Sequence, residues 1–140
     1  MAKHNEVGVI GEQIAEDFLK GKGHKIVTRN FRKPYGEIDI VSREKSGKWH
    51  FIEVKTVSRE TNHKVVSHET GSKSVSHETY RPEENVHPQK MKRLMRVIES
   101  YILSNNVEDE WQFDVIAVYL DQKNKTAQVN YLEDLVLGLN

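Results

Sequence analysis

Two short runs of the sequence, 36–42 and 48–56, combine strand-forming residues with charged residues at alternate positions. Both runs are rich in isoleucine, valine and aromatic residues, which favour β-strands. Successive side chains of a strand point to opposite faces, so the alternating charged residues share a face. We therefore predict two strands, each with two charged side chains on one face and apolar side chains on the other. The four charged residues are Glu37, Asp39, Glu53 and Lys55.

The segment between these strands predicts their register. A three-residue hairpin loop favours glycine at its third position, which is left-handed, and the loop 45–47 ends in glycine. Counting outward from this loop places Asp39 opposite Glu53 and Glu37 opposite Lys55. Residues directly opposed on one face have Cβ atoms about 5 Å apart, so the two carboxylates would repel each other.

A hard divalent cation would offset this repulsion, because Mg²⁺ prefers carboxylate and carbonyl oxygens as ligands. A lysine two residues from Glu53 on the same face could hold a water molecule or neutralise a phosphoryl oxygen. The alternative is a surface hairpin with a simple salt bridge between Glu37 and Lys55. That alternative leaves opposed Asp39 and Glu53 unexplained, and a register slip of one residue would separate the two carboxylates.

The composition excludes several kinds of site. The chain of 140 residues has no cysteine, which excludes disulfides, thiolate metal sites and cysteine nucleophiles, and we expect one domain, 1–140, in the cytoplasm. No run approaches the roughly 18 apolar residues of a membrane span, and the first residues do not look like a secretory signal, so no membrane partner is expected.

The 21 basic and 21 acidic residues balance, but the cations are concentrated in the segments 20–33 and 90–96. Such sorting can create one basic face on a neutral protein, or merely two solvated faces, and charge alone does not separate these readings. If the face binds DNA, the candidate contacts are Arg29, Arg32, Lys33, Gln89, Lys90 and Arg93.

Hydrophobic periodicity predicts an α/β domain in which helices flank a sheet. The first helix is expected over 6–20, capped by Asn5, with an apolar stripe that includes Ile10. The other expected elements are strands over 25–30, 36–42, 48–56, 111–120 and 126–131, a helix over 88–104, and a short turn or helix over 132–137.

The polar segment 57–87 contains three copies of a five-residue motif, Val-Ser-Arg/His-Glu-Thr, with a period of nine residues. It is either a mobile loop or an additional hairpin, and we favour the mobile loop. Its His68 and His77 could bind a metal, although histidines of polar loops are usually only solvated.

The runs around Asp39 and Glu53-Val54-Lys55 resemble the core of PD-(D/E)XK nucleases. The chain more closely resembles the YraN-like family of small bacterial predicted endonucleases, which are related to archaeal Holliday-junction resolvases. The similarity covers nearly the whole chain, and the insertion at about 57–87 is the main departure from the family's pattern. Its other matching blocks are Gly11-Glu12, 23–30, 90–102 and 113–118.

This resemblance implies a restriction-endonuclease-like core in the order αβββαβ and hydrolysis of DNA phosphodiester bonds, at branched structures or nonspecifically. It implies that Asp39, Glu53 and Glu12 bind Mg²⁺ or Mn²⁺ and that Lys55 assists the nucleophile or stabilises the developing charge. Glu37 would support these ligands.

The assignment of Glu12 leaves alternatives open. Glu16, one turn later, could replace it, or Glu12 could be an ordinary acid favoured near a helix N-terminus. A homodimer would suit a branched substrate, because two sites could cut two strands. The alternative function is a DNA-binding or protein-interaction accessory module on a nuclease fold, with weak or no catalysis.

Overall fold

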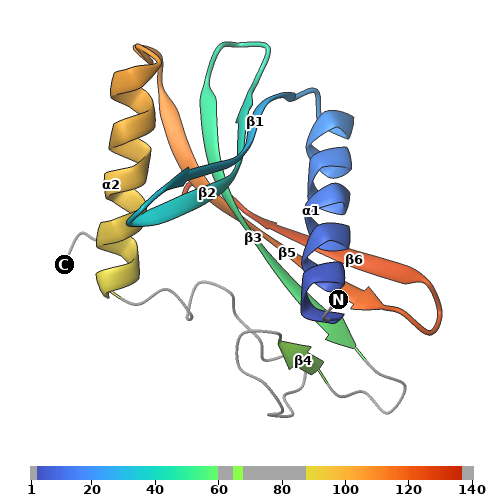
Figure 1. Ribbon diagram of the computed structural model, residues 1–140. Helices are drawn as coiled ribbons and strands as arrows, with labels where there is room; N and C mark the ends of the chain where they lie inside the picture. Colours follow the sequence, from blue (N-terminus) through green and yellow to red (C-terminus); the bar gives the residue numbers. More distant parts are fainter. Residues whose placement is uncertain (1–2, 60–64, 68–87, 137–140) are drawn as a thin grey trace.

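The computed structural model describes residues 3–59, 65–67 and 88–136, which form a six-stranded sheet with two helices packed on it (Figure 1). The elements are α1 (Lys3–Gly21), β1 (Lys25–Lys33), β2 (Gly36–Arg43), β3 (Trp49–Arg59), β4 (Val65–Ser67), α2 (Pro88–Ser104), β5 (Trp111–Asp121) and β6 (Thr126–Leu132).

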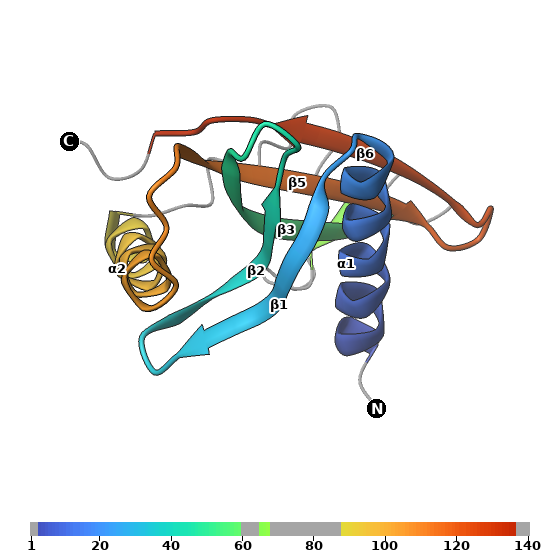
Figure 2. The same ribbon diagram turned by 90° about the horizontal axis from the view of Figure 1, so that it is seen from above.

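The strand order is β1-β2-β3-β5-β6, with β4 paired to the end of β3. The pair β3–β5 is parallel, while the other pairs are antiparallel. The sheet twists strongly, so the β1–β2 hairpin passes between the two helices and lies across the direction of β5 and β6 (Figure 2). The predicted fold class is confirmed: a mixed sheet is flanked by helices in the expected order of elements.

Each helix covers one face of the sheet because successive strand residues face alternate sides. Phe51 of β3 belongs to the apolar cluster beneath α2, whereas its neighbour Ile52 belongs to the cluster beneath α1. Helix α2 has the predicted bounds and buries Leu94, Ile98 and Tyr101 as expected, together with Val97, which the predicted stripe omitted. Neither of the helices within the described residues is long and apolar enough to cross a membrane.

Helix α1 differs from its prediction at its start and along its stripe. It begins at Lys3, so the backbone of Asn5 is already helical and Asn5 is not the N-cap. Ile10, expected to be buried, is 44% exposed. The reason is that the helix meets the sheet along a narrow line of every fourth residue: Val7, Gly11, Ala15 and Leu19.

Gly11 allows the closest approach between α1 and the sheet. A Cβ atom added at this position would lie 2.8 Å from Cβ of Thr56 and closer still to its Oγ1. Any side chain larger than hydrogen would therefore push α1 away from β3. The next residue, Glu12, is brought to β3 by the same approach.

We expect Gly11→Ala to destabilise the protein by about 1–3 kcal/mol, because overpacking outweighs the better helix propensity of alanine. Gly8→Ala, one turn earlier, is the matched control: a Cβ there meets nothing within 4 Å, so the change should stabilise by about 0.5–1 kcal/mol. Urea unfolding of both variants measures the difference, and equal stability of the two would contradict the packing argument.

The segment 57–87 is partly described. Val57–Arg59 extend β3, and β4 pairs antiparallel with them, so a short additional hairpin exists at the start of the segment. The predicted mobility of the rest, with His68 and His77, falls outside the described residues. At the other end of the chain, 133–136 form an irregular segment with a bend at Asp134 and no helix, and residues from 137 onward are also outside the described part.

Candidate functional site

The strands β2 and β3 separate close to the predicted site. Their ladder begins at the expected turn and includes the predicted pair Val41–Phe51, but it ends at Ile40–Ile52. The direct pairs Asp39–Glu53 and Glu37–Lys55 predicted from the turn are therefore wrong. Beyond Ile52, the edge of β3 facing β2 has no strand partner until β4 pairs from Val57, within the residues described.

The separation has a cause in the chain around Asp39. Ile38 packs in the cluster beneath α2, whereas Ile40 packs in the cluster beneath α1, so the predicted alternation of β2 breaks between them. On β1, Asn30 lies between the partners of Ile40 and Ile38, and its backbone is left-handed, with φ of 56°. In place of a backbone partner, the N–H of Val54 donates to Oδ2 of Asp39 at 2.8 Å. The side chain of Asp39 thereby supplies the hydrogen-bond acceptor that the backbone of β2 no longer provides to β3.

Burial raises the pKa of Asp39 well above its usual range, and the Val54 N–H opposes this rise. The negative charges of Glu53 and Glu12, and a hydrogen bond with Glu37, raise the pKa further. The carboxylate thus lies in an environment that carries too little positive charge to balance it. Asp39 and Glu53 are therefore close enough to affect each other's charge, although they are not opposed in the strand ladder.

Glu12 of α1 lies on the other side of the gap between β2 and β3 and adds a third carboxylate. Its Oε1 accepts from Nη2 of Arg29 at 3.2 Å, and the same guanidinium donates through Nη1 to Glu16 at 2.7 Å. Glu16 also pairs with Lys20 at 2.8 Å and does not line the pocket formed by Asp39. Of the two candidate glutamates, Glu12 is therefore the one that faces the site.

Glu53 contacts two lysines, one on its own strand and one on α2. Its Oε2 lies 3.1 Å from Nζ of Lys55 on the same strand and 2.9 Å from Nζ of Lys90 at the start of α2. The side chain of Lys55 is almost fully buried, whereas that of Lys90 is 33% exposed. The predicted same-face neighbours Glu53 and Lys55 are therefore in contact, and Lys90 adds a partner that the sequence pattern did not indicate.

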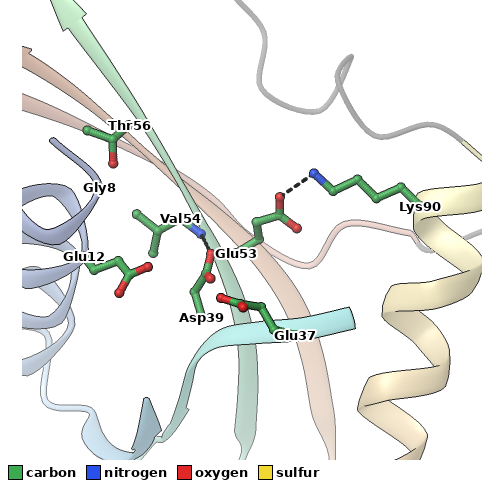
Figure 3. A pocket seen from close by; sticks show the side chains of 8 residues that line it. All are labelled: Gly8, Glu12, Glu37, Asp39, Glu53, Val54, Thr56 and Lys90. Atoms are coloured by element: carbon green, nitrogen blue, oxygen red, sulfur yellow. Dashed lines mark hydrogen bonds and ion pairs between the residues drawn. The ribbon is translucent and has the colours of Figure 1, made fainter. Parts of the chain in front are cut away.

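These side chains surround a pocket of about 340 Å³ between the two helices (Figure 3). Four carboxylates from three elements line it, and Figure 3 shows those of Glu12, Asp39 and Glu37 directed toward the same space. Thr56 and Gly8, which sequence reasoning missed, complete the wall where α1 meets β3. The lining residues are Gly8, Glu12, Glu37, Asp39, Glu53, Val54, Thr56 and Lys90.

The donor atoms of the pocket fit a hard divalent cation. Carboxylate oxygens dominate its lining, and the pKa of Asp39 is raised by burial and by the negative charges of Glu53 and Glu12, which a cation would offset. Glu12, Asp39 and Glu53 are the residues that could hold the ion. Glu37 also lines the pocket, and its Oε1 accepts from Nε of Arg32 at 3.0 Å; its supporting role stays a prediction.

The basic residues of β1 that were candidates for DNA contact are engaged within the protein. Arg29 pairs with the glutamates of α1, Arg32 pairs with Glu37, and Nζ of Lys33 lies 5.6 Å from the ring centre of Phe31. Arg29 therefore orients Glu12 in this structure. Contact of any of the three with DNA stays a prediction.

The candidate contacts on α2 lie at the rim of the pocket or beyond it. Gln89 and Arg93 are exposed on the first turns of the helix, while Lys90 is directed to Glu53. A cation at the pocket entrance can contact a phosphate backbone without reading sequence. DNA contact by these residues also stays a prediction.

We expect Asp39→Asn to stabilise the metal-free protein at neutral pH by about 1 kcal/mol, because asparagine keeps an oxygen for the Val54 N–H but removes the unbalanced charge. Since the folded pKa of Asp39 is raised, the stability of the unchanged protein should fall as pH rises from the unfolded value of about 4 through the folded one. The variant should lack this fall.

Denaturant unfolding with a chelator, measured across this pH range, checks the prediction. Adding Mg²⁺ or Mn²⁺ should then stabilise the unchanged protein in a concentration-dependent way and leave Asp39→Asn nearly unaffected. A destabilised variant with an unchanged pH profile would contradict the assigned environment of Asp39.

The fold and the pocket define the class: an α/β protein with a carboxylate-lined pocket at the open edge of its central strand. The chain belongs to the Uncharacterised protein family UPF0102, whose sequence profile matches residues 11–118. It is 33% identical over 134 residues to a UPF0102 protein of Flavobacterium psychrophilum, covering 96% of each chain. It is 36% identical over 134 residues to a UPF0102 protein of Alkaliphilus oremlandii, covering 94% of this chain and 97% of the relative.

Among solved structures, the fold is similar to that of SfsA from Pyrococcus furiosus in complex with Ca²⁺. The TM-score is 0.39 and the sequence identity is 13%. The likeness covers 92% of this chain and 63% of that chain.

Proposed function

We propose that the protein is a metal-dependent endonuclease that hydrolyses DNA phosphodiester bonds, with its active site in the pocket between α1 and α2. The observation that carries this proposal is that Glu12, Asp39 and Glu53 line one pocket, with the buried amine of Lys55 in contact with Glu53. Carboxylates that hold a divalent cation, beside a fixed lysine, are the parts that phosphodiester hydrolysis requires.

The residues divide this work between them. Asp39 is held by the Val54 N–H and Glu12 by Arg29, so two of the three proposed metal ligands have fixed positions before any ion or DNA binds. A bound Mg²⁺ or Mn²⁺ would supply charge neutralisation and activation of water. Preorganised ligands of this kind need little rearrangement at the moment of reaction.

Lys55 is placed to assist the nucleophile or to stabilise charge on the phosphoryl group. Its side chain is 4% exposed and lies 3.1 Å from Glu53. A buried cation acts in a medium of low dielectric constant, where its interaction with a developing negative charge is stronger than in water. The position of Lys55 is fixed by the strand rather than by a loop, which keeps this charge in place.

A DNA substrate agrees with the position of Lys90. This lysine stands at the pocket rim, and a phosphate could take the place of Glu53 as its partner when a metal ion takes the carboxylate. The exchange would leave no charge unpaired. Branched DNA is the substrate class we favour for testing, and a homodimer could present two such pockets to its two strands.

A second candidate is a DNA-binding or protein-interaction accessory module without catalysis. One observation favours it: Glu53 already accepts from both Lys55 and Lys90, so a metal ion must compete with two amines for this carboxylate. Cleavage assays and DNA-binding assays on the same protein separate the two candidates.

The two glutamates of α1 provide a matched pair for testing the nuclease proposal. We expect Glu12→Gln to lower the Mg²⁺-dependent cleavage rate by at least about 100-fold, because it removes a proposed metal ligand. Glu16→Gln, one turn away and bonded to the same arginine, should leave the rate close to that of the unchanged protein. Equal losses in both variants would show that Arg29 pairing matters and that Glu12 is not a ligand.

Cleavage of labelled four-way junctions, flaps and linear duplex, with Mg²⁺, Mn²⁺ or chelator, gives the direct test. We expect metal-dependent cleavage that Asp39→Asn, Glu53→Gln and Lys55→Ala each abolish, with DNA binding retained. Salt dependence of binding would report the number of phosphate contacts. Tight DNA binding with no cleavage on any substrate would favour the accessory module, and neither binding nor cleavage would reject both candidates.

A further inference from the structure

A second group of potential ligands lies where β2 turns into β3, at the end of the sheet near the α1–β1 connection (Figure 1). Nε2 of His50 lies 2.5 Å from Oε2 of Glu44, and the ring centres of His24 and His50 are 4.5 Å apart. One ligand atom from each of the three residues lies within 4.8 Å of the others. This histidine cluster shares no residue with the pocket proposed as the active site.

The ring of His50 is held by a buried carboxylate. Nδ1 of His50 lies 2.6 Å from Oδ2 of Asp114, which is fully buried. Asp114 also accepts from the hydroxyl of Tyr131 at 2.6 Å, the amide of Gln112 at 2.8 Å and the backbone N–H of Asp134 at 2.9 Å. Histidines that bind metals usually donate their other ring N–H to such a carboxylate. Nε2 of His50 is thereby directed to the rest of the cluster.

The second imidazole is held in a similar way. Oγ of the buried Ser42 lies 2.8 Å from Nδ1 of His24, which leaves Nε2 as its ligating atom. Two rings from separate segments of the chain therefore each have one nitrogen fixed by a neighbour. Fixed orientation of this kind is what a metal site requires beyond the mere presence of histidines.

The donor set distinguishes the cluster from the proposed active site. Two imidazoles and one carboxylate, those of His24, His50 and Glu44, suit Zn²⁺ and related transition-metal ions, whereas a set of oxygen ligands suits Mg²⁺. Without an ion, His50 lies between two carboxylates and needs hydrogen on both nitrogens. A divalent ion bound by both groups would replace the proton that Nε2 shares with Glu44, whose carboxylate must move outward from its 2.5 Å contact to admit the ion. The displaced proton would leave to solvent.

The cluster is accessible from one side. A pocket of about 380 Å³ opens beside it, and His24, Glu44, Tyr131 and Glu133 are among its lining residues. The volume accommodates a water molecule or the carboxylate of Glu133 as a fourth ligand. An ion can therefore enter without disturbing the buried Asp114.

We propose that the histidine cluster binds one divalent transition-metal ion of the Zn²⁺ class, with His24, Glu44 and His50 as ligands. The ion would join the α1–β1 connection to the β2–β3 turn. These two connections position α1 and β2, the elements that carry Glu12 and Asp39, so the ion would stabilise the frame of the other pocket. The proposal does not depend on the nuclease activity.

The test uses the full chain, stripped with a chelator and dialysed, then titrated with Zn²⁺ by calorimetry and with Co²⁺ by visible absorption. We expect one ion per chain, an absorption spectrum typical of tetrahedral nitrogen and oxygen ligation, and a higher melting temperature with Zn²⁺. His24→Gln and Glu44→Gln should each weaken binding by more than the roughly 10- to 100-fold typical of losing a supporting partner.

The double variant His68→Gln with His77→Gln is the control, because it removes two histidines that are not among the three proposed ligands. It should bind Zn²⁺ like the unchanged protein. Binding that is lost in the double variant, or retained unchanged in both His24→Gln and Glu44→Gln, would overturn the proposal.

A second measurement needs no substitution and therefore does not depend on whether the variants fold. In ¹⁵N imidazole spectra of the unchanged protein, Zn²⁺ should shift the Nε2 resonances of His24 and His50. Shifts confined to other histidines, or no shifts at all, would show that the cluster is only a hydrogen-bonded network of ion pairs.

Discussion

The candidate site depends on one hydrogen bond, which the N–H of Val54 donates to the carboxylate of Asp39. A backbone N–H inside a fold needs an acceptor, and Val54 has no backbone acceptor on β2, because β2 has already left β3 after the pair Ile40–Ile52. A side chain therefore completes what the strand does not. The same contact draws a carboxylate into the interior beside two others, which raises its pKa and makes the place favourable for a cation.

The two helices complete the site from opposite sides because the sheet twists between them. The small residue at Gly11 lets α1 lie against Thr56, which brings Glu12 to the opening, and Arg29 holds that glutamate from β1. Helix α2 starts on the other side and directs Lys90 to Glu53. The negative charge of the carboxylates around Asp39 is only partly balanced. Such an imbalance is common at functional sites, which are often less stable than the rest of the fold.

Local sequence patterns predicted the secondary structure and the strand pairs next to a turn. The period of apolar residues located both helices and five of the six strands, and the turn 45–47 gave the register of the first pairs after it. The separation of β2 from β3, the arginine that holds Glu12 and the lysine that reaches Glu53 arise from contacts between distant segments, which no single run of sequence encodes. Asp114 did leave a signal, since it interrupts the apolar run 113–120 of β5, whereas His50 lies among several other polar residues of β3.

The long repeat-bearing segment is attached at both ends to walls of the candidate pocket. It follows Thr56 on β3 and ends just before Lys90 on α2, and both of these residues line the pocket. The entropy of closing a loop rises only with the logarithm of its length, so residues gained or lost between β4 and α2 cost the fold little. Insertion or deletion between β4 and α2 can therefore change the length of chain that connects these two walls of the pocket while the sheet, the helices and the carboxylates remain as they are.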